Sequence, residues 1–308
     1  MNGALKYTAD IDLGAPNDSH VLAVGQVPAN SRVLDLGIAD GSVARVLGRM
    51  GCTVSGVEID PFAADLARSV CKGDVIVGDL NTFEFTEEFR GKHFDVVLML
   101  DVLEHLVDPA AVLGRLTPVV AEGGWGVVSL PNIAHVSARL ALLEGHFTYT
   151  ETGLLDRTHL RFFDRDGIDD LLADAGWGLF DLVRVTRRLG TTEIPAGRPD
   201  PDLVARLESD PEGLTYQFLL SVAPLGSPVL EDPPLLPAHV AQRTLLEAVR
   251  RIEELDEEVR QLRAVHVPDL DAQLSAIHGG SLTRRSHLKH LLAAMQENSQ
   301  RLHNDLGV

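Results

Sequence analysis

Short apolar runs alternate with amphipathic stretches along the first part of the chain. RVLDLG, from residue 32, and TVSGVEI, from residue 53, are apolar runs of strand length, and SVARVLGRM between them has helical periodicity. A strand, a Gly-rich loop, a helix and a second strand form one unit of a parallel sheet. In such sheets, ligands bind at the loops that follow the carboxyl ends of the strands.

The same alternation continues and predicts an α/β fold. After residue 60 come the helix PFAADLARSV, the strands DVIVGDL and FDVVLML, the helix DPAAVLGRLTPVV and the strand WGVVSLPN. Residues 132–165 fit this rhythm poorly and are rich in His and aromatic residues. A helix over 164–177 and two strands, over 179–189 and 214–225, complete the domain, with a Pro-rich insertion at 190–213 that holds a short helix.

A change of composition ends this domain, which we place at residues 1–225. Residues 226–238 have the proline density of an extended linker. Residues 239–308 predict a helical extension with apolar positions at heptad-like spacing, namely Leu245, Val249, Ile252, Leu255, Val259 and Leu262. This helix either associates with a second copy as a coiled coil, giving a homo-oligomer, or packs on its own domain.

Length, charge and composition limit the classes of function. The 308 residues, 45% of them hydrophobic, can bury one large core and an appendage. No run is long and apolar enough for membrane insertion, and the start, MNGALKYTADIDLG, lacks the features of a signal peptide, so we expect a cytoplasmic protein. Cys52 and Cys71 indicate neither a disulfide framework nor a zinc cluster. The formal net charge of −18 argues against a nonspecific nucleic-acid partner.

The Gly-rich loop indicates the charge of its ligand. A dinucleotide site has the spacing G-x-G-x-x-G, which DLGIADG, residues 35–41, lacks. An acid at the end of the strand would also repel a phosphate, so Asp35 favours a ligand with an ammonium or another cationic group. Glu58, at the end of the next strand, can accept hydrogen bonds from both hydroxyls of a ribose.

From residue 7 to residue 225, the motifs and their order resemble the class I S-adenosylmethionine-dependent methyltransferases. VLDLGIADG is similar to the first motif of that family, with Ala39 where Gly is usual, GVEID to the second, GDL to the third and FDVVLMLDVLEHLVDP to the fourth. The resemblance implies a Rossmann-like sheet of seven strands, mostly parallel, whose last strand is reversed. It also implies that S-adenosyl-L-methionine is the cofactor. The cofactor-binding residues that it implies are Asp35, Gly37, Ala39, Gly41, Glu58, Ile59, Asp79, Leu80 and Leu100.

Within that set, the resemblance gives each acidic and apolar residue a part of the cofactor. Glu58 would bind the ribose hydroxyls, and Asp79 would accept a hydrogen bond from the adenine amino group. Ile59 and Leu80 would flank the adenine ring.

Histidines near the strand ends are the candidates for catalysis, because removal of a hydroxyl proton near neutral pH favours His as the base. Taken as the start of a helix, DVLEH places Asp101, Glu104 and His105 on one face above the strand ends. A similar run occurs in ubiquinone-type O-methyltransferases, where a His follows in a stretch similar to THLRFF. This resemblance favours His159 as the base, with His105 and Asp101 shaping the pocket. We assign no role to His20.

Small-RNA 3′-end 2′-O-methyltransferases are similar in the same region, and in them two acids and two histidines hold a divalent metal. The corresponding residues here are Asp101, Glu104, His105 and His159, with Asp101 in place of the expected Glu. Because Asp is the shorter ligand, we favour a site without a metal.

Residues 132–165 also resemble the corresponding part of bacterial methyltransferases encoded with glycosyltransferases of cell-surface polysaccharide pathways. Arg139, Arg157 and Arg161 either grip a sugar nucleotide or a phosphate, or pair with nearby acids. Those acids would be Asp156, Glu151 and Asp164. The resemblance implies O-methylation of a sugar or saccharide-linked hydroxyl, on a small-molecule or saccharide acceptor.

Other functions stay open. A cofactor-binding domain without catalysis would act as a scaffold through its C-terminal helices. An NAD-linked oxidoreductase is disfavoured by the missing dinucleotide spacing. A metal-assisted RNA 2′-O-methyltransferase is disfavoured by the net charge of −18.

Overall fold

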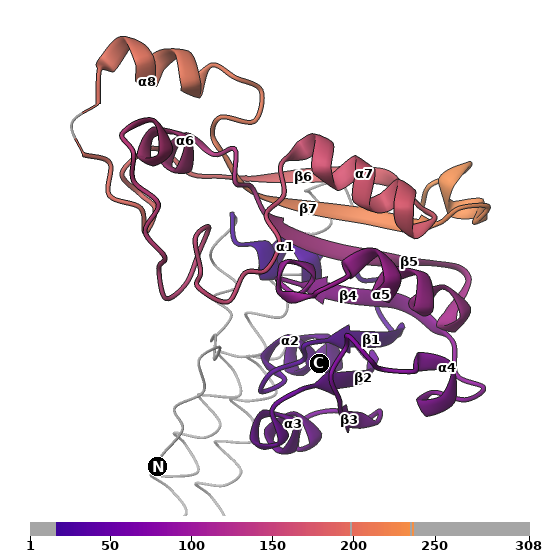
Figure 1. Ribbon diagram of the computed structural model, residues 1–308. Helices are drawn as coiled ribbons and strands as arrows, with labels where there is room; N and C mark the ends of the chain where they lie inside the picture. Colours follow the sequence, from indigo (N-terminus) through magenta and orange to yellow (C-terminus); the bar gives the residue numbers. More distant parts are fainter. Residues whose placement is uncertain (1–16, 198, 235, 237–308) are drawn as a thin grey trace, which may run out of the picture. The chain divides into compact units, whose positions relative to one another are not determined.

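The strands form one sheet of seven in the order β3-β2-β1-β4-β5-β7-β6. The computed structural model describes residues 17–197, 199–234 and 236. Strands β1 to β5 pair in parallel, and β7 is antiparallel to both of its neighbours, β5 and β6. Their bounds are β1 Arg32–Leu36, β2 Thr53–Glu58, β3 Val75–Val77, β4 Phe94–Leu100, β5 Val120–Pro131, β6 Trp177–Thr186 and β7 Thr215–Pro224 (Figure 1). The predicted Rossmann-like sheet with a reversed last strand is confirmed.

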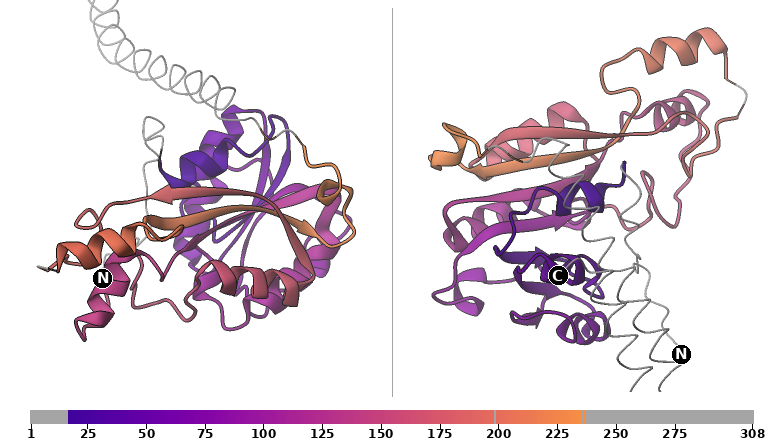
Figure 2. Two further views of the ribbon diagram at one scale, coloured as in Figure 1. Left: turned by 90° about the horizontal axis from the view of Figure 1, so that it is seen from above. Right: turned by 180° about the vertical axis from the view of Figure 1, so that it is seen from behind.

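Helices cover both faces of this sheet (Figures 1 and 2). One face carries α1 Ser19–Val24, α2 Ser42–Arg49 and α3 Pro61–Arg68, and the other carries α4 Phe85–Glu88, α5 Pro109–Leu116 and α7 Arg165–Ala175. Each face has its own apolar core, with Val21, Leu47 and Leu98 in one and Leu113, Ile168 and Phe218 in the other. The strands are buried on both faces of the sheet, and for this reason their sequences are nearly continuous apolar runs. Among the described residues, no helix combines the length and apolarity needed to cross a membrane.

Asp-Pro pairs start several of these helices. The Asp60 side chain accepts a hydrogen bond from the backbone N–H of Phe62 at 2.8 Å. Asp108 does the same for Ala111 at 3.0 Å. Asp satisfies a free N–H of the first turn, and the Pro that follows fits there without losing a hydrogen bond. The apolar pattern does not predict α1, α4 or α6 Val136–Leu143, which have only 6, 4 and 8 residues and give periodicity little length to act on.

Residues 132–165 and the insertion at 190–213 pack together beyond the end of β5, and we call these two segments the cap. Helix α6 contacts α8, Pro201–Glu208, and both lie to one side of the sheet in Figure 1. Leu140 and Leu207 belong to the apolar cluster between these helices. A second small cluster contains Ala138, Leu154, Leu155, Ile194 and Tyr216. The cap is therefore built from two segments that are distant in the sequence.

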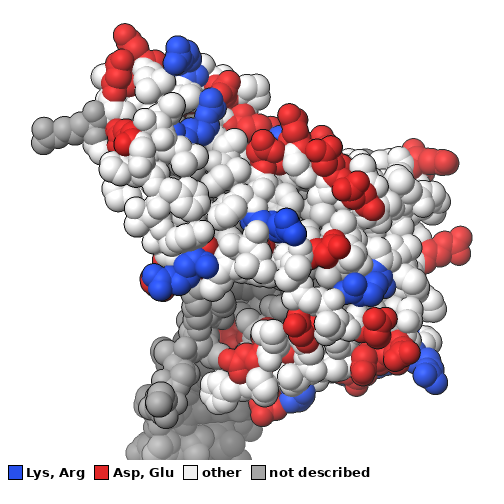
Figure 3. All heavy atoms as spheres, in the orientation of Figure 1, with Lys and Arg blue, Asp and Glu red and all other residues white. Residues whose placement is uncertain are grey.

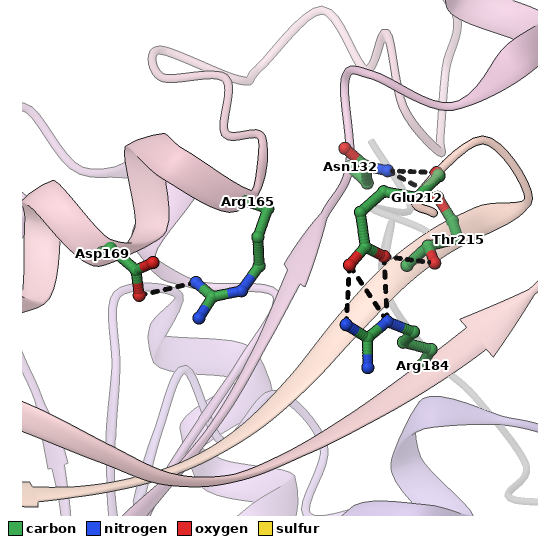
Figure 4. Close-up of polar contacts among 6 residues, drawn as sticks. All are labelled: Asn132, Arg165, Asp169, Arg184, Glu212 and Thr215. Atoms are coloured by element: carbon green, nitrogen blue, oxygen red, sulfur yellow. Dashed lines mark hydrogen bonds and ion pairs between the residues drawn. The ribbon is translucent and has the colours of Figure 1, made fainter. Parts of the chain in front are cut away.

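Polar contacts fasten the end of the insertion to the sheet (Figure 4). The Glu212 carboxylate accepts hydrogen bonds from Arg184 of β6 and from the Thr215 hydroxyl, each at 2.7 Å for the shortest contact. The side-chain amide of Asn132, which follows β5, donates to the carbonyl oxygens of Glu212 and Thr215 at 3.1 and 2.8 Å. The first segment of the cap therefore begins after β5, and the second ends before the neighbouring strand β7.

Acidic side chains gather along the outer face of α7 (Figure 3). The exposed residues of this face are Asp166, Asp169, Asp170 and Asp174. The opposite face of the helix buries Ile168, Leu171 and Leu172 against the sheet. The helix is therefore amphipathic, and part of the net negative charge of the chain lies on its solvent side.

The first residues of the predicted linker belong to the folded domain. Pro228–Leu230 form a short 3₁₀ turn, η3, in which Val229 is buried. A side chain at Gly178 of β6 would meet Leu230 at 2.9 Å, which shows how closely this turn packs. The prediction of an extended linker over 226–238 is therefore wrong at its start, because apolar residues between the prolines dock on the sheet. The predicted extension over 239–308, with its coiled coil and homo-oligomer, lies outside the described residues.

Candidate functional site

The sheet order places the Gly-rich loop at the point where the strand order reverses, between β1 and β4. The chain continues from β1 to β2 on one side and from β4 to β5 on the other. In open α/β sheets, the crevice at this point receives the ligand. The loop after β1 touches the turn after β4, since a side chain at Gly37 would lie 3.0 Å from Cγ2 of Val102. The predicted cofactor loop and the predicted catalytic turn are therefore neighbours.

The loop backbone is held in an unusual conformation. Gly37, Ala39 and Gly41 have φ angles of 69°, 49° and 81°, in the left-handed region that favours glycine. Gly41 has no room for a side chain, because a Cβ there would lie 2.7 Å from Cγ2 of Val70. Ala39 adopts this region at a cost of about 1–2 kcal/mol. That cost is offset by a hydrogen bond from its N–H to Glu58.

Glu58 ends β2 and holds the loop from both sides. Its Oε2 accepts from the backbone N–H of Ala39 and its Oε1 from that of Asp60, both at 2.9 Å. Each carboxylate oxygen keeps a second lone pair that can accept a hydroxyl. Ile59, the next residue, is 66% exposed and offers an apolar face beside it. This arrangement fits the ribose and adenine roles predicted for these two residues.

Asp35 is buried inside β1, with 4% of its surface exposed. Burial raises the pKa of this carboxyl to about 7, with His20 opposing the shift and Glu58 adding to it. A cationic ligand placed against Asp35 would favour its ionised form and lower that pKa. The site therefore fits a ligand with an ammonium group, as the sequence predicts.

The residues after β3 differ in their exposure. Asp79 is exposed, and its Oδ1 accepts hydrogen bonds from the backbone N–H and the amide of Asn81 at 2.9 and 2.8 Å. Leu80 is buried in the apolar core beneath, whereas Leu100, at the end of β4, is partly exposed. Asp79 and Ile59 therefore present more surface to an adenine ring than Leu80 does.

The predicted helix at DVLEH does not form, and this changes which residues come together. Asp101 has a φ of 55°, in the left-handed region, and only Leu103–His105 form a short 3₁₀ turn, η1. The reversal at Asp101 turns its side chain back to the sheet. Its Oδ1 accepts hydrogen bonds from Ser129 Oγ, at 2.9 Å, and from the amide of Gln217. The prediction that Asp101, Glu104 and His105 share one helical face is wrong for this reason.

Glu104, His105 and His159 form a cluster beside this turn. One carboxylate oxygen and two ring nitrogens lie within 4.8 Å of one another, and the two imidazole centroids are 4.9 Å apart. Of the four residues predicted as metal candidates, the structure groups these three, while Asp101 has turned away to Ser129 and Gln217. The cluster joins residues of η1 with a residue of the cap.

The carboxyl group of Glu104 has no hydrogen-bond partner among the described residues. Both of its oxygens are buried, and 1% of the residue is exposed. Burial, followed by the nearby charge of Asp101, raises its pKa well above the usual range of a glutamate. A buried carboxyl without partners is costly, so such a group is expected to hold a proton, a cation or a ligand.

The three arginines of the cap are engaged by protein groups. Arg157 pairs with Glu151 at 2.6 Å, which is the predicted alternative in which the arginines pair with nearby acids. Arg139 pairs with Asp210 of the insertion, and Arg161 donates to the carbonyl oxygen of Val107 at 2.6 Å. The other predicted partners, Asp156 and Asp164, instead accept from backbone N–H groups of Thr158 and Gly167. A phosphate grip by these arginines would require breaking these contacts.

Three residues of the site were not identified from the sequence. His20, to which no role was assigned, lies on α1 within electrostatic reach of Asp35 and Asp101, and its pKa is raised first by a hydrogen bond to Asp18. Ser129 and Gln217 bind Asp101 from β5 and β7. Alternation along β7 could have put Gln217 on one face of a strand, but no local signal links it to a residue 116 positions away.

The sequence is similar to those of known methyltransferases. A family profile for a methyltransferase domain matches residues 15–181 of the 308. The ubiquinone biosynthesis O-methyltransferase of Thiobacillus denitrificans is 31% identical over 121 residues, which cover 39% of this chain and 52% of that protein. That of Psychrobacter arcticus is 29% identical over 162 residues, covering 50% of this chain and 62% of its own. The chain therefore spans between half and two thirds of the length of these curated relatives.

Solved methyltransferase structures are similar to part of this chain. The magnesium protoporphyrin IX methyltransferase of Synechocystis, with bound SAH, is 16% identical over 71% of this chain and 91% of its own, at a TM-score of 0.46. The family profile covers more than half of the chain and spans the loop after β1, the acid that ends β2 and the turn after β4. This protein therefore belongs to the methyltransferase domain family, within the class I S-adenosylmethionine-dependent methyltransferases.

Proposed function

We propose that this protein is an S-adenosylmethionine-dependent O-methyltransferase whose acceptor hydroxyl is presented to His159 and His105. The observation that carries the proposal is the cluster of Glu104, His105 and His159 beside the turn that touches the cofactor loop. A methyltransferase must align an acceptor with the methyl group and, for a hydroxyl, remove a proton. The cluster supplies two histidines that could accept this proton. One of them, His105, belongs to η1, and the other, His159, belongs to the cap.

The residues of this chain fit the cofactor. Asp35 and Glu58 offer a buried carboxyl and two acceptor oxygens, and the glycines allow the left-handed backbone of the loop. When bound, S-adenosylmethionine supplies a methyl group on a sulfonium, which is transferred by in-line displacement. The loop residues would bind and orient it, and His159 would accept the hydroxyl proton. Proton removal by a positioned base contributes typically ~10²- to 10⁴-fold to the rate.

A divalent metal is a second candidate for the same cluster. Two imidazoles and a carboxylate are a common donor set, and the unpartnered oxygens of Glu104 fit a cation. Glu104, His105 and His159 would hold it, without the Asp101 of the predicted set. Such a cation would polarise the acceptor hydroxyl as a Lewis acid. Ring nitrogens that ligate a metal are not free to act as bases, so the two uses of the histidines exclude each other.

The acceptor class is proposed from the cap. Four rings form a chain of contacts. The distances between ring centroids are 6.0 Å from His159 to Phe162, 6.1 Å from Phe162 to Phe147 and 5.3 Å from Phe147 to Tyr149. All three aromatic residues are exposed. Their faces can pack against the apolar face of a ring that carries the hydroxyl, either a saccharide or a phenol. We propose a saccharide-linked hydroxyl, as the resemblance of residues 132–165 implies, and a phenolic hydroxyl of the kind that the name of the relatives suggests is the rival.

The first experiment is calorimetric titration of the purified protein with S-adenosylhomocysteine, with NAD in parallel. Micromolar binding of the first alone supports the proposal, and binding of NAD instead would revive the oxidoreductase. A methyl-transfer screen with labelled cofactor then compares sugar nucleotides with catechols, with and without magnesium or manganese. Cofactor binding without transfer to any acceptor would favour the scaffold that acts through the C-terminal helices.

The role of the cluster is tested by His159→Ala. Turnover should fall at least 10²-fold with unchanged affinity for S-adenosylhomocysteine, because His159 is proposed to meet the acceptor and not the cofactor. His146→Ala, an exposed histidine of the same segment, is the matched control. An unaffected rate in the His159 variant would remove it as the base. Loss of bound manganese, measured on the protein without substrate, would identify it as a ligand.

A further inference from the structure

Asp101 is the residue of the site with the most constrained geometry. Its φ of 55° lies in a region that residues other than glycine adopt at a cost. Ser129 and Asp101 form a reciprocal pair: the Ser129 hydroxyl donates to Oδ1 at 2.9 Å and accepts from the Asp101 N–H at 2.9 Å. Gln217 donates to the same Oδ1 from β7. Three strands, β4, β5 and β7, therefore fix one carboxyl group.

This carboxyl group lies at the crevice that receives the cofactor. It directly follows β4, and Val102, the next residue, is the one that a side chain at Gly37 would meet. Among the described residues, both donors engage Oδ1, which leaves Oδ2 for a ligand. Asp101 is partly exposed, whereas Ser129 and Gln217 behind it are buried. The two donors are thus buried in the sheet, whereas Asp101, which directly follows β4, keeps part of its surface exposed.

The ionisable groups around the crevice are mostly acidic. Asp35 in β1 and Asp101 after β4 flank it, and Glu58 closes the loop on the far side. His20 of α1 is the cationic group that acts on both aspartates. Burial raises the pKa of Asp101, and the charge of His20 together with hydrogen bonds from Ser129 and Gln217 opposes that shift. The ammonium group of the cofactor can pair with only one of the two aspartates. The other aspartate stays available for a second cationic centre.

We propose that Ser129 and Gln217 are positioning residues that aim Asp101 at the sulfonium of the cofactor, so that the site prefers the charged cofactor over its neutral product. The product, S-adenosylhomocysteine, keeps the ammonium group and has lost the sulfonium charge. Transfer of the methyl group therefore removes the charge that Asp101 stabilises, and the product leaves more readily. This inference rests on the part of the proposed function that concerns the cofactor and on none that concerns the acceptor.

The test measures dissociation constants for three ligands by calorimetry. They are S-adenosylmethionine, S-adenosylhomocysteine and sinefungin, in which a protonated amine replaces the sulfonium. The wild-type protein should bind both charged ligands about tenfold more tightly than the neutral one. Asp101→Asn should remove this preference. Gln217→Met and Ser129→Ala should reduce it by weakening the charged ligands while the affinity for S-adenosylhomocysteine changes less than about twofold.

Ser221→Ala is the matched control. Ser221 is a buried serine on the same strand as Gln217, and its hydroxyl donates to Gln26 rather than to Asp101. It should leave the ratio of affinities unchanged. Ser129→Ala removes one donor and little volume, so it serves if Gln217→Met fails to fold.

Two results would overturn the proposal. One is a wild-type protein that binds all three ligands equally. The other is an equal loss of affinity for all three in the Gln217 and Ser129 variants, which would mean that these residues only support the shape of the site. Absence of binding by any of the three would instead overturn the proposed function itself.

Discussion

At the scale of single residues, the acids at the strand ends differ in what surrounds them, and this difference sets their roles. Glu58 accepts two backbone N–H groups, Asp35 is buried in its strand, and Asp101 is held by side chains from two other strands. Glu104 has no partner among the described residues. These surroundings are the basis on which we propose Glu58 as loop anchor, Asp35 as cation site and Glu104 as ligand or proton holder.

Glu58→Ala should weaken binding of S-adenosylhomocysteine by about 1–3 kcal/mol. The variant loses the acceptors for the ribose and also releases the N–H groups of Ala39 and Asp60 that hold the loop. Calorimetry of the purified variant measures the change. Asp65→Ala, an acid on α3 that pairs with Arg68 at the surface, is the control and should bind normally. Unchanged affinity in the Glu58 variant would remove the ribose assignment.

Asp35 should give the protein a stability that falls with rising pH. Its pKa is raised in the folded state to about 7, from about 4 in the unfolded chain, so the folded protein binds this proton more tightly. The corresponding stability is complete below about pH 4 and is lost as the pH rises through about 7. Asp35→Asn should remove roughly 2–4 kcal/mol of this decline.

Urea unfolding of both proteins between pH 4 and pH 8 measures the effect. The difference between their free energies of unfolding is the informative quantity, because His20, Asp101 and Glu104, whose pKa values are also raised, are present in both proteins. A difference that does not vary with pH would show that Asp35 does not take up a proton in this range.

At the scale of elements, the cap depends on a few side chains that link its two segments. Glu193 of the insertion accepts a hydrogen bond from the backbone N–H of Leu154 at 2.6 Å and another from the Tyr216 hydroxyl at 2.8 Å. A side chain at Gly153 would lie 2.2 Å from the Glu193 carboxyl carbon, so the two segments are in close contact. Glu193 therefore holds the loop that leads to His159 against β7.

Glu193→Ala should loosen that loop without changing the cofactor site. Loss of two hydrogen bonds, at about 1 kcal/mol each, should speed amide hydrogen exchange at Leu154 by about tenfold or more. Affinity for S-adenosylhomocysteine should stay the same, and the KM for the acceptor should rise. Glu151→Ala removes a surface ion pair with Arg157 in the same segment and should have little effect. Equal exchange rates in the Glu193 variant and the wild type would refute the link.

At the scale of the whole molecule, the sheet brings together residues that lie far apart in the sequence. Its order places the loop after β1 beside the turn after β4, and the reversed β7 between β5 and β6 carries Gln217 to Asp101. The cap contributes His159 to the cluster with Glu104 and His105. The end of the described domain is also part of this assembly, because η3 packs on the sheet.

Truncation should therefore depend on where the chain is cut. A protein that ends after Leu236 should bind S-adenosylhomocysteine as the full chain does. One that ends after Leu225 exposes the surface that Val229 and Leu230 cover, and its free energy of unfolding should fall by about 2–4 kcal/mol. Denaturant unfolding and calorimetry of both proteins make the comparison. Loss of binding in the protein that ends after Leu236 would show that later residues support the site.

The sequence by itself determined the parallel sheet, the loop after β1, Glu58 at the end of β2 and the helices that begin at Asp-Pro pairs. These features are local: period, turn residues and caps act over a few positions, so they can be read in order along the chain. The separation of Asp101 from Glu104 and His105, the partners Ser129 and Gln217, the position of His20 and the docking of η3 were decided only by the tertiary structure. Strand register and the left-handed turn at Asp101 depend on contacts between distant segments, and no local pattern specifies these contacts.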